Sequence, residues 1–139
     1  MGDGDFKKEP IMIKTITTGA LLAAAALLVT PTANADPDGS AWAAIAYSTT
    51  TGKETIVTNA ASQLDGMNHA MASCNKAAGD NSCKVVTFSK FCVSLATDPN
   101  PNNNTVYSGG KGNTLAAADA DAMSGAQAGW TIEEHGCNS

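Results

Sequence analysis

Two histidines lie near carboxylates at spacings that could support acid–base chemistry, and the first such pair is Asp65 and His69. Residues four apart share one face of a helix, so the carboxylate could orient the imidazole as a general base. The same spacing also produces ordinary surface ion pairs, which are far more common than catalytic pairs. Asp65 and His69 are therefore weak candidates. A small secreted hydrolase built on them would need a serine or threonine nucleophile that the sequence does not identify.

The second histidine closes the run Glu133-Glu134-His135, whose side chains are of types that bind divalent cations. We expect this run to be a strand, in which neighbouring side chains point to opposite faces. The three groups then cannot converge on one ion, and a solvated strand edge is the better interpretation. We therefore expect no metal site and no cofactor.

Two further patterns resemble functional motifs without completing them. Residues 109–112, Gly-Gly-Lys-Gly, precede a predicted helix but lack the full spacing of a phosphate-binding loop, so we interpret them as a hinge turn. Asp119 and Asp121 are two apart on that helix and diverge by roughly 200°, so they do not form a carboxylate pair. No catalytic residue is assigned.

The four cysteines, Cys74, Cys83, Cys92 and Cys137, indicate two disulfides rather than a metal site. No Cys-x-x-Cys pair is present, and the count is even. Cys83 and Cys92 would lie roughly 30 Å apart on one straight strand, too far for a bond. A helix end at Cys74 and a strand start at Cys83 favour Cys74–Cys83 with Cys92–Cys137. The alternative of 74–92 with 83–137 remains open. The longer loop closed by Cys92 and Cys137 predicts the larger loss of stability on removal, by about 1 kcal/mol.

The first 35 residues have the composition of a secretory signal peptide. Lysines precede an apolar stretch over 16–29, and Ala33-Asn34-Ala35 supplies a cleavage pattern of small residues. The natural start could be Met12. A membrane anchor is the less favoured alternative, because the apolar run is short and no basic flank follows it. We expect a leader over 1–35, a polar lead-in over 36–40 and a single domain over 41–139.

Charge excludes one class of partner. The chain carries a net charge of −5, and all eight of its basic residues are lysines. An acidic surface without guanidinium groups repels nucleic acid and anionic lipid. We expect a protein or envelope partner, no nucleic acid, and no stable membrane span after cleavage of the leader.

Hydrophobic periodicity divides the remaining chain into two halves of the same order. The predicted elements are strands over 41–47 and 54–58, a helix from Ser62 to Cys74, strands over 84–91, 93–96 and 105–108, a helix from Thr114 to Ala126, and a strand over 130–134. Ser62 and Thr114 are candidate N-caps. We expect the first helix to bury a stripe of Leu64, Met67, Met71 and Cys74, and the second to bury Leu115, Ala118, Ala122, Met123 and Ala126. The fold class is α+β, a small disulfide-stapled domain of two similar β-β-α-β units, with Cys92 ending the first unit and Cys137 the second.

These residues resemble a known family. The segments AWAAIAYS, CKVVTFSKFC and VYSGGKGNTLAAADADAM are similar to domain-of-unknown-function family 4189, which occurs in small exported bacterial proteins, many of them mycobacterial. The similarity covers about 42–137. It implies a secreted α+β domain and implies no activity.

The sequence leaves three functions open. The preferred one is a secreted binding or interaction module of the cell envelope or extracellular space. The alternatives are the hydrolase using His69 and Asp65, and an inhibitor of an exported enzyme that presents the loop over 98–104.

Overall fold

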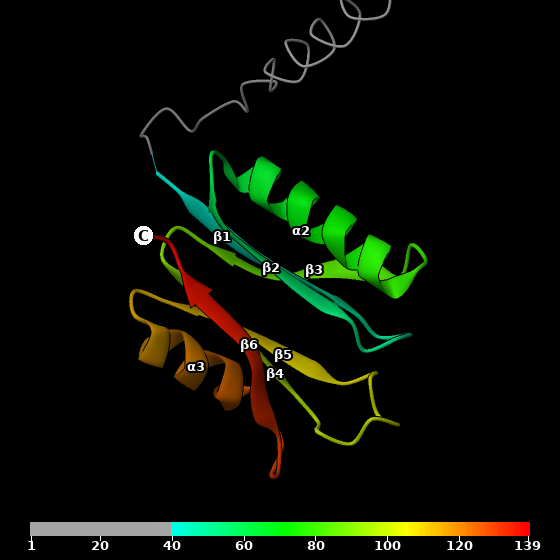
Figure 1. Ribbon diagram of the computed structural model, residues 1–139. Helices are drawn as coiled ribbons and strands as arrows, with labels where there is room; N and C mark the ends of the chain where they lie inside the picture. The colour runs from blue at the N-terminus through cyan, green and yellow to red at the C-terminus, as the bar shows by residue number, and fades with distance from the viewer. Residues whose placement is uncertain (1–39) are drawn as a thin grey trace, which may run out of the picture. The chain divides into compact units, whose positions relative to one another are not determined.

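Each half of the chain forms a three-stranded antiparallel sheet with one helix on it (Figure 1). The computed structural model describes residues 40–139. The elements are β1 (Trp42–Ser48), β2 (Glu54–Ala60), α2 (Gln63–Ala78), β3 (Cys83–Ser89), β4 (Cys92–Thr97), β5 (Tyr107–Gly112), α3 (Leu115–Ser124) and β6 (Thr131–Cys137). The predicted leader lies outside the described residues, as does most of the lead-in. Among residues 40–139, no helix is long and apolar enough to cross a membrane.

The two sheets repeat one topology. Their strand orders are β2-β1-β3 and β5-β4-β6, so the first strand of each unit is central in its sheet. In both sheets the pairing of the central strand with the last strand of its unit shifts register once. The shift lies between Ile45 and Ala46 in β1 and between Leu95 and Ala96 in β4. The prediction of two similar β-β-α-β units is confirmed.

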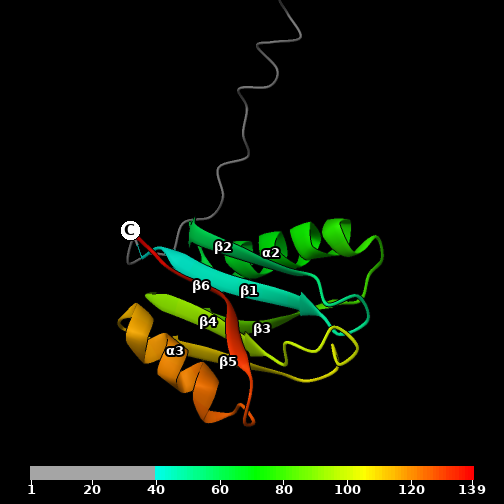
Figure 2. The same ribbon diagram turned by 60° about the horizontal axis from the view of Figure 1, so that its bottom comes forward.

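The sheets pack face to face and the helices cover their outer faces (Figure 2). Side chains alternate along a strand, so β1 contributes to both of its faces. Ile45 and Tyr47 pack against Val93 and Leu95 between the sheets. Under α2, Ala44 and Ala46 of β1 pack against Ala70 and Cys74 of the helix. Because β1 and β4 are covered on both faces, their sequences are runs of small and apolar residues.

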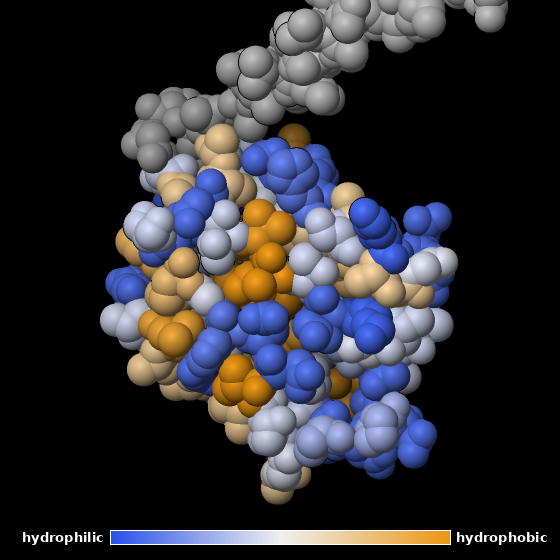
Figure 3. All heavy atoms as spheres, in the orientation of Figure 1, coloured by the Kyte–Doolittle hydropathy of each residue, from blue (hydrophilic) through white to orange (hydrophobic). Residues whose placement is uncertain are grey.

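One side of the sandwich brings the edge strands β2 and β6 together. Hydrophobic residues gather near the middle of this side and hydrophilic residues surround them (Figure 3). Gly136 of β6 lies against Ile56 of β2, and a Cβ at residue 136 would be 2.8 Å from Ile56 Cδ1. These hydrophobic residues are therefore part of the packing between the two sheets.

The predicted buried stripe of α2 is confirmed at Cys74, which is buried, and at Met67, which packs against the core, but it is wrong at Leu64 and Met71. The buried residues of this helix are Gly66, Ala70 and Cys74, whereas Leu64 and Met71 are exposed. Small side chains let the helix backbone lie close to β1 and β2, as the 3.2 Å between a Cβ at residue 66 and Ala60 Cβ indicates. Size, and not hydrophobicity alone, decides which face of α2 is buried.

The predicted hinge turn over 109–112 is also wrong, because these residues belong to β5. A Cβ at Gly110 would lie 2.2 Å from Ala122 N and 2.3 Å from Ala118 O. The glycines therefore let α3 approach the strand backbone directly. Of the stripe predicted for α3, only Ala118 and Ala122 are fully buried, and Met123 is exposed.

Both predicted N-caps are confirmed. Ser62 Oγ accepts a hydrogen bond from Asp65 N at 3.1 Å, and Thr114 Oγ1 accepts one from Ala117 N at 3.1 Å. Gly79 ends α2 with a φ of 77°, a left-handed conformation that glycine adopts at little cost. The turn that follows brings β3 back under the helix.

Candidate binding site at one end of the sandwich

The structure contains two disulfides, Cys74–Cys83 and Cys92–Cys137, and no free cysteine. These are the two bonds that the sequence analysis favoured. Cys74–Cys83 joins the last turns of α2 to the first residue of β3. Cys83 N also donates to Asn75 Oδ1 at 2.9 Å, so this junction has a second link.

Cys92 and Cys137 do not occupy equivalent positions, contrary to the sequence-based expectation. Cys92 is the first residue of β4, and Cys137, at the end of β6, is its cross-strand partner. When the two sheets are aligned on their register shifts, Trp42 corresponds to Cys92 and Lys90 corresponds to Cys137. There Lys90 Nζ lies 5.5 Å from the centroid of the Trp42 ring. A cation–π contact in the first sheet thus corresponds to a disulfide in the second.

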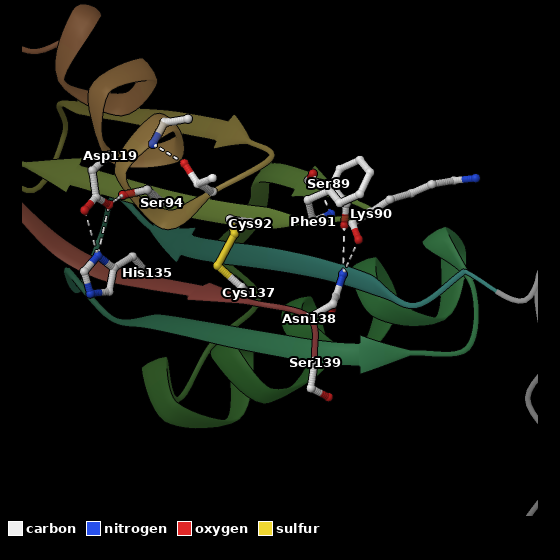
Figure 4. The surroundings of a disulfide bond; sticks show 12 residues. Ser89, Lys90, Phe91, Cys92, Ser94, Asp119, His135, Cys137, Asn138 and Ser139 are labelled. Carbon is white, nitrogen blue, oxygen red and sulfur yellow. Dashed lines mark hydrogen bonds and ion pairs between the residues drawn. A yellow bond between two sulfur atoms is a disulfide. The ribbon is translucent and has the colours of Figure 1, made fainter.

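Asn138 joins the chain end to both sheets (Figure 4). Its Nδ2 donates to Lys90 O at 2.9 Å and to Ala41 O at 3.1 Å. Its Oδ1 accepts from Asn59 N at 2.7 Å, and its backbone N donates to Phe91 O at 2.9 Å. One side chain therefore connects segments from β1, β2 and the β3–β4 turn.

These links frame a hollow of about 500 Å³, which we call the terminal hollow. Its lining residues are Ser40, Ala41, Lys90, Phe91, Cys92, Asn113, Thr114, Leu115, Cys137, Asn138 and Ser139. Phe91 is 53% exposed although it is a large apolar side chain. The volume falls within the usual range of roughly 300–1,000 Å³ for ligand pockets. The lining combines an aromatic ring, a leucine and a disulfide with amide, hydroxyl and ammonium groups.

A second polar cluster lies on the outer face of the second sheet and was missed by the sequence analysis. Ser94 Oγ donates to Asp119 Oδ1 at 2.7 Å, and His135 Nδ1 lies 2.9 Å from the same oxygen. Figure 4 shows the carboxylate between the other two groups. The hydroxyl donates its proton to the carboxylate and not to the imidazole, so in this arrangement the cluster is not a nucleophile–base pair. A buried serine in an otherwise apolar strand was the available signal, because buried hydroxyls need a partner.

Asp119 and Asp121 point to different partners, as their spacing predicted. Asp121 Oδ2 accepts from Lys111 N at 2.9 Å, and this bond attaches α3 to β5. Lys111 N is therefore not available to a phosphate group.

The weak candidates from the sequence, His69 and Asp65, lie together on α2 with Nε2 and Oδ1 3.7 Å apart. The His69 side chain is 66% exposed, and neither residue lines any of the four hollows described on residues 40–139. This geometry matches a surface ion pair. Within the described part of the chain, no group of three or more His, Cys, Asp or Glu side chains could hold a metal ion.

At the opposite end, Glu54 of β2 has a raised pKa. Burial raises the pKa of Glu54, and the charges of Glu133 and Glu134 raise it further. Burial also raises the pKa of Tyr47, with smaller contributions from Glu54 and Glu133. Tyr47 and Glu133 border a hollow of about 270 Å³ beside the loop over 98–104.

The fold and its links define a class: a small α+β domain of two β-β-α-β units, each with its own disulfide. Within that class the chain belongs to a family described as a domain of unknown function (DUF4189), whose profile matches residues 42–137. Neither the curated proteins nor the solved structures include a match.

Proposed function

We propose that this chain is an exported bacterial binding module of the cell envelope or extracellular space, and that the terminal hollow is its binding site. The observation that carries the proposal is Phe91, a half-exposed aromatic ring on the wall of that hollow. Aromatic side chains that are held in place contribute strongly to protein–protein contacts. The ring sits between the disulfide partner Cys92 and the turn that Asn138 fixes, so it is presented on a rigid frame.

The chemistry of the hollow favours a polypeptide partner. An apolar side chain of the partner would contact Phe91 and Leu115, and the amide and hydroxyl groups of Asn113 and Ser139 would meet its backbone. The lysine-only, acidic composition disfavours nucleic acid. The leader expected over 1–35 supplies the export, with a mature N-terminus at Asp36.

Peptide display tests the site. Random peptides are selected on the oxidised protein, and their affinities are measured on Phe91→Ser and on Leu64→Ser. Leu64 is a matched control because it is also an exposed apolar residue but lies on α2, outside the terminal hollow. We expect the affinity of the selected peptides to be at least tenfold lower for Phe91→Ser and to be unchanged for Leu64→Ser. Equal affinity for all three proteins would reject the terminal hollow as the site.

Export has its own test. The gene is expressed from Met12 in a bacterial host, and the intact mass of the protein in the medium and envelope is determined. The expected species begins at Asp36. A major species that retains 12–35 would reject the signal peptide without affecting the test of the hollow.

The loop over 98–104 favours a second candidate, inhibition of an exported enzyme. Asp98 accepts hydrogen bonds from Asn100 N at 2.9 Å and from Asn103 Nδ2 at 2.8 Å, and these bonds lower the pKa of its carboxyl group. A loop held by its own side chains loses little entropy on binding. Assays against a panel of secreted hydrolases, with Asp98→Ala as the variant, test this function. The hydrolase alternative with His69 and Asp65 receives no support from the geometry.

A further inference from the structure

The two disulfides differ in their access to solvent. Cys74 and Cys83 are 0% and 4% exposed and lie in the core beneath α2. Cys137 is exposed, and it lines the terminal hollow together with Cys92. A small molecule can reach the second bond from solvent, but it can reach the first only if α2 moves away from its sheet.

We propose that Cys92–Cys137 is a thiol-exchange site, at which Cys137 accepts a low-molecular-weight thiol, whereas Cys74–Cys83 is a purely structural bond. The reaction needs only access to Cys137 Sγ, so it does not require that the hollow binds peptides.

The direction of attack follows from burial. Cys92 is 3% exposed whereas Cys137 is an exposed residue, so we expect an incoming thiolate to attack Cys137 Sγ. A new S–S bond forms between the thiol and Cys137, the Cys92–Cys137 bond breaks, and its electron pair leaves on Cys92 Sγ. The product is a mixed disulfide at Cys137 and a thiolate at Cys92, with no net oxidation or reduction.

The start of α3 stabilises that leaving group. Asn113, Thr114 and Leu115 line the same hollow as Cys92. The first N–H groups of a helix carry a partial positive charge, which favours a nearby thiolate. Thr114 Oγ1 satisfies one of these groups, Ala117 N, and so fixes the first turn in place.

The surrounding frame makes the exchange reversible. Val93 pairs with Gly136 and Ser94 with His135, so the β4–β6 ladder does not depend on the disulfide alone. The bond from Asn138 N to Phe91 O holds the other side of the cysteine pair. Cys92 and Cys137, whose Cα atoms are 4.0 Å apart, therefore stay opposite each other when the bond opens. The Cys92 thiolate can then attack the mixed disulfide and expel the small thiol.

The test uses the folded protein with both disulfides formed. It is incubated with excess reduced glutathione at mildly alkaline pH without denaturant, quenched with acid, alkylated and mapped by mass spectrometry. We expect glutathione on Cys137 and a free thiol on Cys92, formed at least tenfold faster than any opening of Cys74–Cys83, which serves as the control in the same molecule. Removal of glutathione should restore the Cys92–Cys137 bond.

A second measurement separates local exchange from unfolding. The rate at Cys92–Cys137 should not change at low urea concentrations, whereas opening of Cys74–Cys83 should accelerate as urea promotes unfolding. Equal rates for the two bonds, the same urea dependence for both, or an adduct mainly on Cys92 would overturn the proposal.

Discussion

Asn59 N donates a hydrogen bond of 2.7 Å to Asn138 Oδ1, and this bond joins the end of β2 to the residue after β6. Asn59 has a φ of 58°, the only positive value at a non-glycine residue among those described. Its own side chain accepts from Ser139 N at 2.9 Å. Asn59 thus donates to Asn138 and accepts from Ser139, and these two bonds tie the last residues of the chain to the first unit and hold the left-handed backbone at residue 59.

Asn138→Ala should destabilise the protein by about 2–3 kcal/mol, because it removes two side-chain donors and one acceptor whose bonds contribute roughly 1 kcal/mol each. Asn138→Asp keeps the acceptor for Asn59 N but places a carboxylate oxygen against the carbonyl oxygens of Lys90 and Ala41, so it should destabilise the protein at least as much. Urea unfolding measures both. Asn102→Ala is the control, since Asn102 is exposed and its side chain makes no hydrogen bond within the described residues. A loss below 0.5 kcal/mol for Asn138→Ala, on the scale of ordinary surface changes, would contradict the role assigned to it.

Gly110→Ala should displace α3 from β5 and cost more than about 3 kcal/mol, because the new methyl group would overlap the helix backbone at Ala118 and Ala122. Lys111→Ala is the matched control on the same strand, where the exposed side chain can be shortened while its backbone bond to Asp121 remains. Thermal unfolding followed by circular dichroism compares the two variants. Similar melting temperatures would show that α3 does not require direct contact with the strand backbone.

Removing either disulfide should cost a similar amount, about 3–5 kcal/mol, when each pair is replaced by alanines. Considered by loop length alone, loss of the Cys92–Cys137 bond should lower the free energy of unfolding by about 1 kcal/mol more than loss of Cys74–Cys83. The buried Cys74–Cys83 bond also fills core space, and its removal leaves voids that cost roughly 1 kcal/mol each. Equilibrium unfolding of the two double variants gives the order. If the Cys92/Cys137 double variant is the less stable of the two by about 1 kcal/mol, chain entropy alone sets the order and the voids cost little.

Glu54→Gln should raise stability at neutral pH by less than about 1 kcal/mol. Burial and the charges of Glu133 and Glu134 raise the pKa of Glu54 in the folded state above its ordinary value of 4.5. Between the pKa of Glu54 in the unfolded state and its higher pKa in the folded state, the folded protein binds more protons than the unfolded chain. The free energy of unfolding therefore falls as pH rises through that range. The variant lacks this loss, and its advantage should vanish below pH 4, where Glu54 is protonated in both states. Unfolding free energies from pH 3.5 to 7.5 measure the difference, and an advantage that persists at acid pH would contradict the electrostatic cause.

The patterns of the sequence predicted the elements well because their causes are local. Ser62 and Thr114 cap their helices through bonds that span three residues. The polar turn after Gly79 brings Cys83 to Cys74. Because the two cysteines are only nine residues apart, at a helix end and a strand start, their bond could be predicted from the sequence. The repeated order of elements was enough to infer two similar units, and the structure confirms them.

Only the tertiary structure decided which faces are buried and which polar groups meet. Leu64 and Met71 are large apolar residues of α2, yet they are exposed, whereas the small residues Gly66 and Ala70 are buried against the sheet. Gly110 belongs to a glycine-rich segment that is typical of a turn. In the structure it is a strand residue, and the missing side chain leaves room for α3. Ser94, Asp119 and His135 are far apart in the sequence and belong to three elements, so no local spacing could reveal their contact. Most of the elements, their order and the role of the cysteines could be inferred from the sequence, because they depend on neighbouring residues. The terminal hollow and the Asn59–Asn138 bond could not, because they depend on how the two sheets stack.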